Sequence, residues 1–222
     1  MHSSDLAVLY FFNQTIASPA MDTFMGILTN VQYWYPVYLL GGLYLIYRYK
    51  WRGFRMVVAA LLLVLLTDSL NHYVLKSLVD RARPCAELAT GGHVVSWIRL
   101  PIGPRSDPSF PSSHALNNFA VAALLGVIDP RKKFGRVFYP VALVISIGRI
   151  YEGVHYPSDV VGGAVIGITI GFLFAMLFEF VEERITHKTP VKRQQEILTA
   201  EEIGSVDLAE NKERMRVWLQ QQ

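Results

Sequence analysis

The stretch Met56–Leu66, MVVAALLLVLL, is a dense apolar run that decides the fold class of this chain. It lies inside a longer apolar segment, residues 54–75, that ends at the cationic sequence Lys76-Ser-Leu-Val-Asp-Arg-Ala-Arg83-Pro84. A helix needs roughly 20 mostly apolar residues to cross a bilayer. Because residues 54–75 meet that requirement, we expect a transmembrane helix that leads directly into a charged motif.

Four further segments approach the same requirement, and they run from about 33–47, 112–128, 137–150 and 158–180. The chain has 222 residues, 52% of them hydrophobic, and its mean hydropathy of +0.29 is high for a soluble domain. The last segment carries Gly162, Gly163, Gly167 and Gly171, a spacing of small residues that permits close helix approach in lipid. The sequence therefore predicts an all-α, polytopic membrane helix bundle with five transmembrane helices.

The two ends of the chain differ from this central part. Residues 5–30 are apolar but are interrupted by polar residues and a proline, so we expect two short helices at the membrane surface. If they cross the membrane instead, the bundle has six spans. Residues beyond 182 are charged and lack a long apolar run. The predicted parts are an N-terminal interfacial segment (1–32), a transmembrane domain (33–181) and a soluble, cytoplasmic tail (182–222).

The basic residues predict the orientation of these spans. The net charge is +3 and the pI about 9.0, but the Lys and Arg residues gather at the ends of apolar runs, which indicates membrane topology and not nucleic-acid binding. With five spans, three basic groups fall on one side: those around residues 48–55, 131–136 and 184–193. No Lys or Arg precedes Arg48. The positive-inside tendency then places these groups and the C-terminus in the cytoplasm.

That same count of spans puts three charged motifs together on the opposite face. They are Lys76–Pro84, Pro111–His114 and Arg149–Asp159. Lys76, Arg83 and Arg149 supply the cations that a phosphoryl group needs around its oxygens as it transfers. Any one of these side chains alone could be an interfacial anchor, but three cations beside two histidines favour a single phosphate site.

The second and third motifs add donors and proton-transfer groups. Ser112 and Ser113 fall in the expected first turn of a helix, after Pro111, where backbone amides attract anions; helix capping is the plainer interpretation of these serines. His114 can act as a general acid. His155 and Asp159 are four residues apart, and a carboxylate bonded to one imidazole nitrogen frees the other to attack. His155 would then carry the phosphoryl group before water hydrolyses it.

Other chemistries find less support in the sequence. The remaining histidines are scattered, and neither an HExxH pattern nor a carboxylate cluster is present, so a metal site is not expected. A single cysteine, Cys85, excludes an intrachain disulfide. His72 and Asp68 lie inside the second apolar segment, where ionisable groups are costly, and either could support the site.

The three motifs resemble those of the type 2 phosphatidic acid phosphatase superfamily of integral membrane lipid phosphatases. The family patterns are Lys, six residues, Arg-Pro; Pro-Ser-Gly-His; and Ser-Arg, five residues, His, three residues, Asp. This sequence matches all three in order across residues 54–180, with two departures. Ser113 stands in place of glycine, which bears on how closely the backbone approaches phosphate, and Gly148 stands in place of serine, which removes a hydroxyl ligand.

The resemblance implies a role for each matching position. His155 is the implied nucleophile, Asp159 its orienting partner and His114 the general acid. The implied phosphate ligands are Lys76, Arg83, Arg149 and Ser112, with the backbone amides of Ser113 and His114. The family is metal-independent, so no metal and no cofactor is expected.

The leading hypothesis is thus an enzyme, a lipid phosphate or diphosphate phosphatase working through a phosphohistidine. Undecaprenyl diphosphate in the outer leaflet is the first expected substrate, followed by phosphatidylglycerol phosphate, a lipid A phosphate and phosphatidic acid. The expected location is the bacterial inner membrane, with the site facing the periplasm. The alternatives are phosphotransfer between lipids and an anion or lipid transporter lined by Asp68 and the outer arginines. The soluble vanadate-binding haloperoxidases share these motifs, but the apolar spans argue against them.

Overall fold

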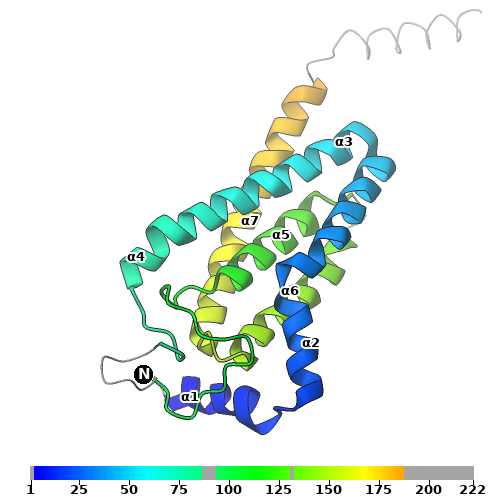
Figure 1. Cartoon of the computed structure of the whole chain (residues 1–222). Coiled ribbons are helices and arrows are strands. Elements are labelled where there is room, and N and C mark those ends of the chain that lie inside the picture. Colours follow the sequence, from blue (N-terminus) through cyan, green and yellow to red (C-terminus); the bar gives the residue numbers. More distant parts are fainter. Residues whose placement is uncertain (1–2, 87–93, 131–132, 188–222) are drawn as a thin grey trace, which may run out of the picture. The chain divides into compact units, whose positions relative to one another are not determined.

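The computed structural model describes residues 3–130, except 87–93, and residues 133–187, and helices are the only regular elements in these ranges (Figure 1). The α-helices are α1 (Ser3–Tyr10), α2 (Pro19–Thr29), α3 (Tyr35–Leu70), α4 (Lys76–Val79), α5 (Ser113–Ile128), α6 (Phe134–Tyr151) and α7 (Pro157–His187). Short π-helical turns, Phe11–Thr15 and Asn71–Leu75, and a 3-10 turn, Val31–Trp34, connect several of them. The all-α prediction is confirmed.

Helix α3 contains a reversal that separates two antiparallel apolar arms (Figure 1). Lys50 adopts φ 53°, which breaks the helical path and sends the chain back on itself. Gly53 follows, and a Cβ atom there would overlap the carbonyl oxygen of Leu45. Only glycine permits this approach. The two arms correspond to the first and second predicted apolar segments.

Helices α5 and α7 pack at very short range, as the glycine spacing predicts. A Cβ atom added to Gly163, Gly167 or Gly171 would meet the backbone carbonyl of Ser112, Leu116 or Ala120, in that order. Each set advances four residues at a time, so one face of α7 lies directly on one face of α5. This contact fixes the start of α5 against the first turns of α7, where two of the charged motifs lie.

The hydrophobic core joins both arms of α3 to α5 and α7. Met56 and Leu63 of α3 and Leu124 and Ile128 of α5 are completely buried in it. Many other Leu, Val and Phe side chains on the same helices are more than half exposed, as lipid-facing residues of a membrane bundle would be. Burial therefore follows helix–helix contact and not hydrophobicity alone.

By length and hydropathy, three helical stretches in the described ranges are able to cross a membrane: Val31–Val79, Phe134–Tyr151 and Pro157–Ile185. The first contains the α3 reversal, and α5 is a shorter apolar helix. The prediction of five crossings is compatible with these helices but stays a prediction. The contacts divide the chain into residues 1–178 and 179–222. Of the predicted tail, residues 188–222 lie outside the described residues.

The N-terminal segment forms α1 and α2 and packs on the end of the bundle that carries the motifs, and its position at the membrane surface stays a prediction. Helix α2 packs against α6. Leu9 of α1 is fully buried in a second apolar cluster with Ala115, Ile150 and Tyr156. The N-terminal helices therefore belong to the packed structure around the motifs.

Candidate active site

The three motifs converge in the structure. Lys76 begins α4, Ser112 precedes α5, and the third motif runs from the last turn of α6 to the first turn of α7. The amide of Ser112 donates to the carbonyl oxygen of Asp159 at 3.1 Å, which ties the second motif to the third. Arg83 of the first motif contacts His155 of the third at 3.0 Å. The predicted convergence of separate connections on one place is what the structure shows.

His155 lies in the connection between α6 and α7 and is only 2% exposed. Its Nε2 atom lies 3.0 Å from Nη1 of Arg83, and because a guanidinium only donates, Nε2 must accept. The ring proton then sits on Nδ1, which faces Oδ2 of Asp159 at 3.6 Å. This separation is longer than a hydrogen bond, and catalytic contacts of this kind commonly shorten when substrate binds.

The environment of His155 keeps its imidazole neutral. Burial lowers the pKa of His155 to about 4, and the positive charges of Arg83 and Arg149 act in the same direction against the opposing effect of Asp159. A neutral ring with an unprotonated Nε2 is the form that can attack phosphorus.

Asp159 is completely buried and is held from several sides. Its Oδ2 accepts from the hydroxyl of Ser109 at 2.5 Å and from the amide of Tyr156 at 2.8 Å. Its Oδ1 accepts from Arg81 at 2.7 Å. These bonds fix the carboxylate beside Nδ1 of His155.

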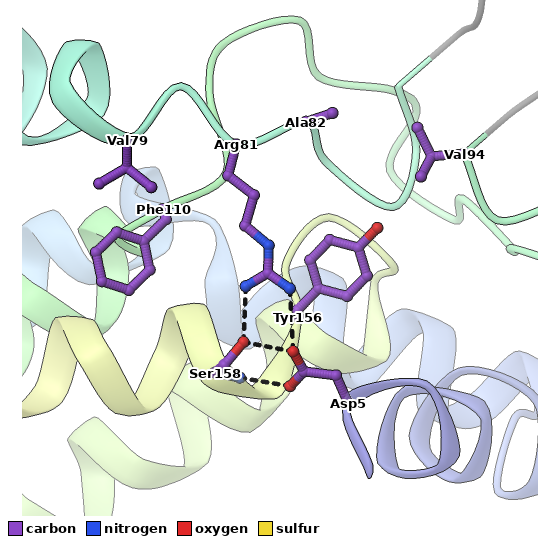
Figure 2. A pocket seen from close by; sticks show the side chains of 8 residues that line it. All are labelled: Asp5, Val79, Arg81, Ala82, Val94, Phe110, Tyr156 and Ser158. Atoms are coloured by element: carbon purple, nitrogen blue, oxygen red, sulfur yellow. Dashed lines mark hydrogen bonds and ion pairs between the residues drawn. The ribbon is translucent and has the colours of Figure 1, made fainter. Parts of the chain in front are cut away.

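Arg81 joins this carboxylate to the N-terminal helix. Figure 2 shows its guanidinium pointing at Ser158 and Asp5, which it contacts at 2.7 and 3.0 Å. Ser158 in turn donates its amide to Asp5 at 2.9 Å. These groups border a pocket of about 430 Å³ lined by Asp5, Val79, Arg81, Ala82, Val94, Phe110, Tyr156 and Ser158. The pocket is mostly apolar, and it adjoins the Arg81 side chain that bonds Asp159.

Lys76 and Arg83 share one carboxylate, that of Asp107. Oδ2 of Asp107 forms an ion pair with Lys76 and another with Nη2 of Arg83, at 2.9 Å in the second case. Arg83 also donates to the backbone carbonyls of Asp107 and Val154, each at 2.7 Å. Both cations are buried, and Arg83 also contacts Nε2 of His155.

Arg149 is paired with a different carboxylate. Its Nη1 contacts Oε2 of Glu152 at 2.5 Å, and Oε1 of Glu152 accepts the hydroxyl proton of Thr29. The carbonyl of Thr29 lies 3.2 Å from Nε2 of His114. One residue at the end of α2 thus connects the predicted general acid to the third cation.

Several buried polar atoms have no hydrogen-bond partner among the described residues. At this site they include the hydroxyl of Ser112, which is fully buried, Nε of Arg149 and Nδ1 of His155. Ser112 is the N-cap of α5, but its side chain makes no capping bond, so the capping interpretation does not account for it. The helix begins at Ser113, two residues after Pro111 and later than predicted. Ser113 accepts from Asn71 at 2.7 Å.

The departure at Gly148 has a steric reason. A Cβ atom there would lie 2.6 Å from Cγ2 of Thr29 and 3.5 Å from the sulfur of Met25. The missing side chain lets α2 pack against α6 closely enough for Thr29 to reach Glu152.

Sequence reasoning missed Asp107, Glu152, Thr29 and the Asp5–Arg81 pair. Glu152 carried a signal, because it follows Arg149 by three residues in an otherwise apolar and glycine-containing stretch. Thr29 and Asp5 carried none, since only the packing of α1 and α2 brings them to the motifs. Asp68 and His72 are exposed; Asp68 accepts from Asn117 at 3.3 Å and His72 contacts Tyr73.

Comparison with known proteins identifies the family. The model of the PAP2 superfamily matches residues 38–182, which include all three motifs. The chain belongs to this superfamily. A curated relative, lipid A 4'-phosphatase of Bacteroides thetaiotaomicron, is 33% identical over 190 residues, covering 84% of this chain and 82% of the relative.

Two other PAP2 relatives are informative. Phosphatidylglycerophosphatase B of Bacillus subtilis is 31% identical over 146 residues, covering 62% of this chain and 63% of that protein. The crystal structure of Aquifex aeolicus LpxE is similar in fold, with a TM-score of 0.61 and 24% identity over 78% of this chain and 95% of that one. Together with its apolar helices, these relatives show that this PAP2 chain is an integral membrane protein.

Proposed function

We propose that this chain is a lipid phosphatase that removes a terminal phosphate from a membrane lipid through a phosphohistidine at His155. One observation supports this most directly. His155 presents an unprotonated Nε2 toward Arg83, while Nδ1 faces the buried, hydrogen-bonded carboxylate of Asp159. An imidazole fixed in this tautomer beside buried cations is arranged to attack an anionic phosphorus centre.

The phosphate would be held by side chains that already surround Nε2. Lys76 and Arg83 share the Asp107 carboxylate, Arg83 also contacts Nε2, and Arg149 supplies a third charge. The buried hydroxyl of Ser112 and the amides of Ser113 and His114 at the start of α5 add neutral donors. These groups stabilise the charge on the equatorial oxygens during transfer.

The reaction has two displacements. In the first, Nε2 of His155 bonds to phosphorus, the bond from phosphorus to the lipid oxygen breaks, and His114 gives that oxygen a proton. Asp159 stabilises the positive charge that forms on the imidazole. In the second, His114 takes a proton from water, the water oxygen bonds to phosphorus, and the N–P bond breaks to release inorganic phosphate and regenerate His155.

The Bacteroides relative supports a lipid A phosphate as the first substrate to test, ahead of the undecaprenyl diphosphate expected from the sequence. The bacterial relatives and the positive-inside tendency support a site on the periplasmic face of the inner membrane and a cytoplasmic C-terminus. The transporter hypothesis loses its main feature, because Asp68 is exposed and bonds Asn117 and not a motif residue.

The test is phosphate release by the purified full chain from a panel of lipid phosphates and diphosphates. We expect His155→Ala to abolish release, while His72→Ala, which changes an exposed histidine in the turn before α4, retains it. Equal activity of His155→Ala and the wild type would reject the proposal. Transfer of phosphate to a second lipid without release would identify a phosphotransferase instead of a hydrolase.

A further inference from the structure

The carboxylate of Asp107 joins the two cations of the first motif. A single oxygen, Oδ2, bridges Lys76 and Nη2 of Arg83, as an oxygen of a bound phosphate would. Building on the proposed function, we propose that Asp107 is a built-in counter-ion that the substrate must replace. This exchange would select lipids with a terminal phosphate over the phosphodiester lipids of the surrounding bilayer.

The burial of the three side chains supports an exchange. Lys76 and Arg83 are 7% and 5% exposed, whereas Asp107 is 44% exposed. The carboxylate is therefore the outer member of the cluster and lies between the cations and the surroundings. It can leave the cations without any opening of the helical core.

The backbone around Asp107 supports the same conclusion. Residues 104–107 are exposed and belong to no helix. Two positions later, Ser109 is buried, donates its amide to the carbonyl of Arg81 at 2.7 Å and bonds Asp159 at 2.5 Å. Rotation of the Asp107 side chain would leave that anchor intact, together with the bond from Arg83 to the Asp107 carbonyl. The Asp107 carboxylate can therefore move while Ser109 keeps its bond to Asp159.

The charges explain why such an exchange discriminates among lipids. Burial opposes ionisation of Asp107, but Lys76 and Arg83 outweigh it and hold the pKa of this carboxyl well below its usual range, so it competes as an anion. A phosphodiester also carries one negative charge, so replacing Asp107 with it gains no charge interaction with the two cations. A terminal phosphate has a second pKa of about 6 and therefore carries nearly two negative charges at neutral pH. Its interaction with the two cations is stronger than that of the carboxylate it replaces.

A plain structural clamp is the competing interpretation, and it predicts the opposite result. If Asp107 only holds Lys76 and Arg83 in position, its neutralisation would loosen both cations and weaken phosphate binding. If Asp107 is a competitor, the same change would strengthen phosphate binding and admit phosphodiesters. The variant Asp107→Asn keeps the size of the side chain and removes the charge, so it separates the two.

The experiment compares wild type, Asp107→Asn and a matched control, Asp22→Asn, each as the full chain in mixed micelles. Asp22 pairs with Arg99 and Tyr151, so the control removes one carboxylate charge from the same end of the molecule without touching Lys76 or Arg83. Inorganic phosphate binding is measured by 31P NMR line broadening, and lipid phosphate hydrolysis is measured with and without added phosphatidylglycerol. Asp107→Ser replaces the Asn variant if the latter does not fold.

We expect Asp107→Asn to bind inorganic phosphate about fivefold more tightly than wild type. This is the change in binding constant expected when one partly exposed ion pair no longer competes. We also expect phosphatidylglycerol to inhibit Asp107→Asn and to leave wild type and Asp22→Asn unaffected. Unchanged or weaker phosphate binding, or absence of this inhibition, would overturn the proposal. If no variant releases phosphate from any lipid, the proposed function fails, and the phosphate-binding comparison still decides the role of Asp107.

Discussion

The cations of the site pair with two different carboxylates, one in each half of the site, and these carboxylates differ mainly in burial. Asp107 joins Lys76 to Arg83 and is 44% exposed, whereas Glu152 pairs with Arg149 and is fully buried. Loss of the carboxylate leaves a buried cation in each half, but solvent reaches Asp107 and can take its place beside Lys76 and Arg83, whereas it does not reach Glu152. The same chemistry therefore gives a replaceable counter-ion in one half and a permanent support in the other.

The largest expected effect tests the carboxylate that faces Nδ1 of His155. Asp159→Asn keeps the shape of the side chain but removes the charge that holds the tautomer of His155. We expect the turnover number to fall by about three to four orders of magnitude with little change in phosphate binding. Steady-state phosphate release and 31P NMR binding measure the two quantities. Near-normal turnover would remove Asp159 from the mechanism and leave His155 without a partner.

The next effect sharpens the contrast between the two carboxylates. Glu152→Gln leaves Arg149 buried beside a neutral side chain, so we expect the free energy of unfolding to drop by about 3–5 kcal/mol. Asp107→Asn should lower it less, because solvent reaches this side chain and can replace the lost charge beside Lys76 and Arg83. Thermal unfolding in detergent measures both. Equal losses of stability in the two variants would contradict the distinction drawn from burial.

A smaller effect tests the packing that brings Thr29 to Glu152. Gly148→Ser restores the family residue but places a Cβ atom 2.6 Å from Cγ2 of Thr29, and we expect a loss of about 1–3 kcal/mol in unfolding free energy. Thr29→Ser removes that methyl group and keeps the hydroxyl. The double variant should therefore recover most of the loss. Additive losses in the double variant would show that the two residues do not meet.

The smallest effect concerns the protonation of His155. Its folded-state pKa of about 4 lies below the ordinary value of 6.5, so between these pH values the unfolded chain binds more protons than the folded one. We expect the contribution of His155 to stability to be complete above pH 6.5 and to be lost as the pH falls toward 4. Histidine 15N NMR would give the pKa directly. A value near 6.5 would mean that the ring is neither buried nor beside Arg83.

The sequence predicted most of the helical segments and the three motifs because both depend on local patterns. Apolar runs gave the helices, and fixed spacings gave Lys76, Arg83, His155 and Asp159. The basic residues between the first two apolar segments also predict a turn near residues 48–55, but not how tight it is, since that depends on the positive φ of Lys50 and the close approach at Gly53.

The residues that complete the site were hidden for a related reason. Asp5 and Thr29 reach the motifs only through the packing of α1 and α2, which no spacing encodes. Asp107 lies in an irregular stretch where composition carries little structural information. In this chain the cations could be found from the sequence, whereas the carboxylates that pair with them required the folded structure.

The stereochemistry at phosphorus tests the central claim most directly. Wild-type enzyme would be given a lipid phosphate made chiral with oxygen isotopes, and the phosphate would be captured by an alcohol acceptor in place of water. Two displacements through His155 predict retention of configuration. Inversion would mean that the acceptor attacks the lipid phosphate directly, and it would contradict the assignment of His155 as the nucleophile.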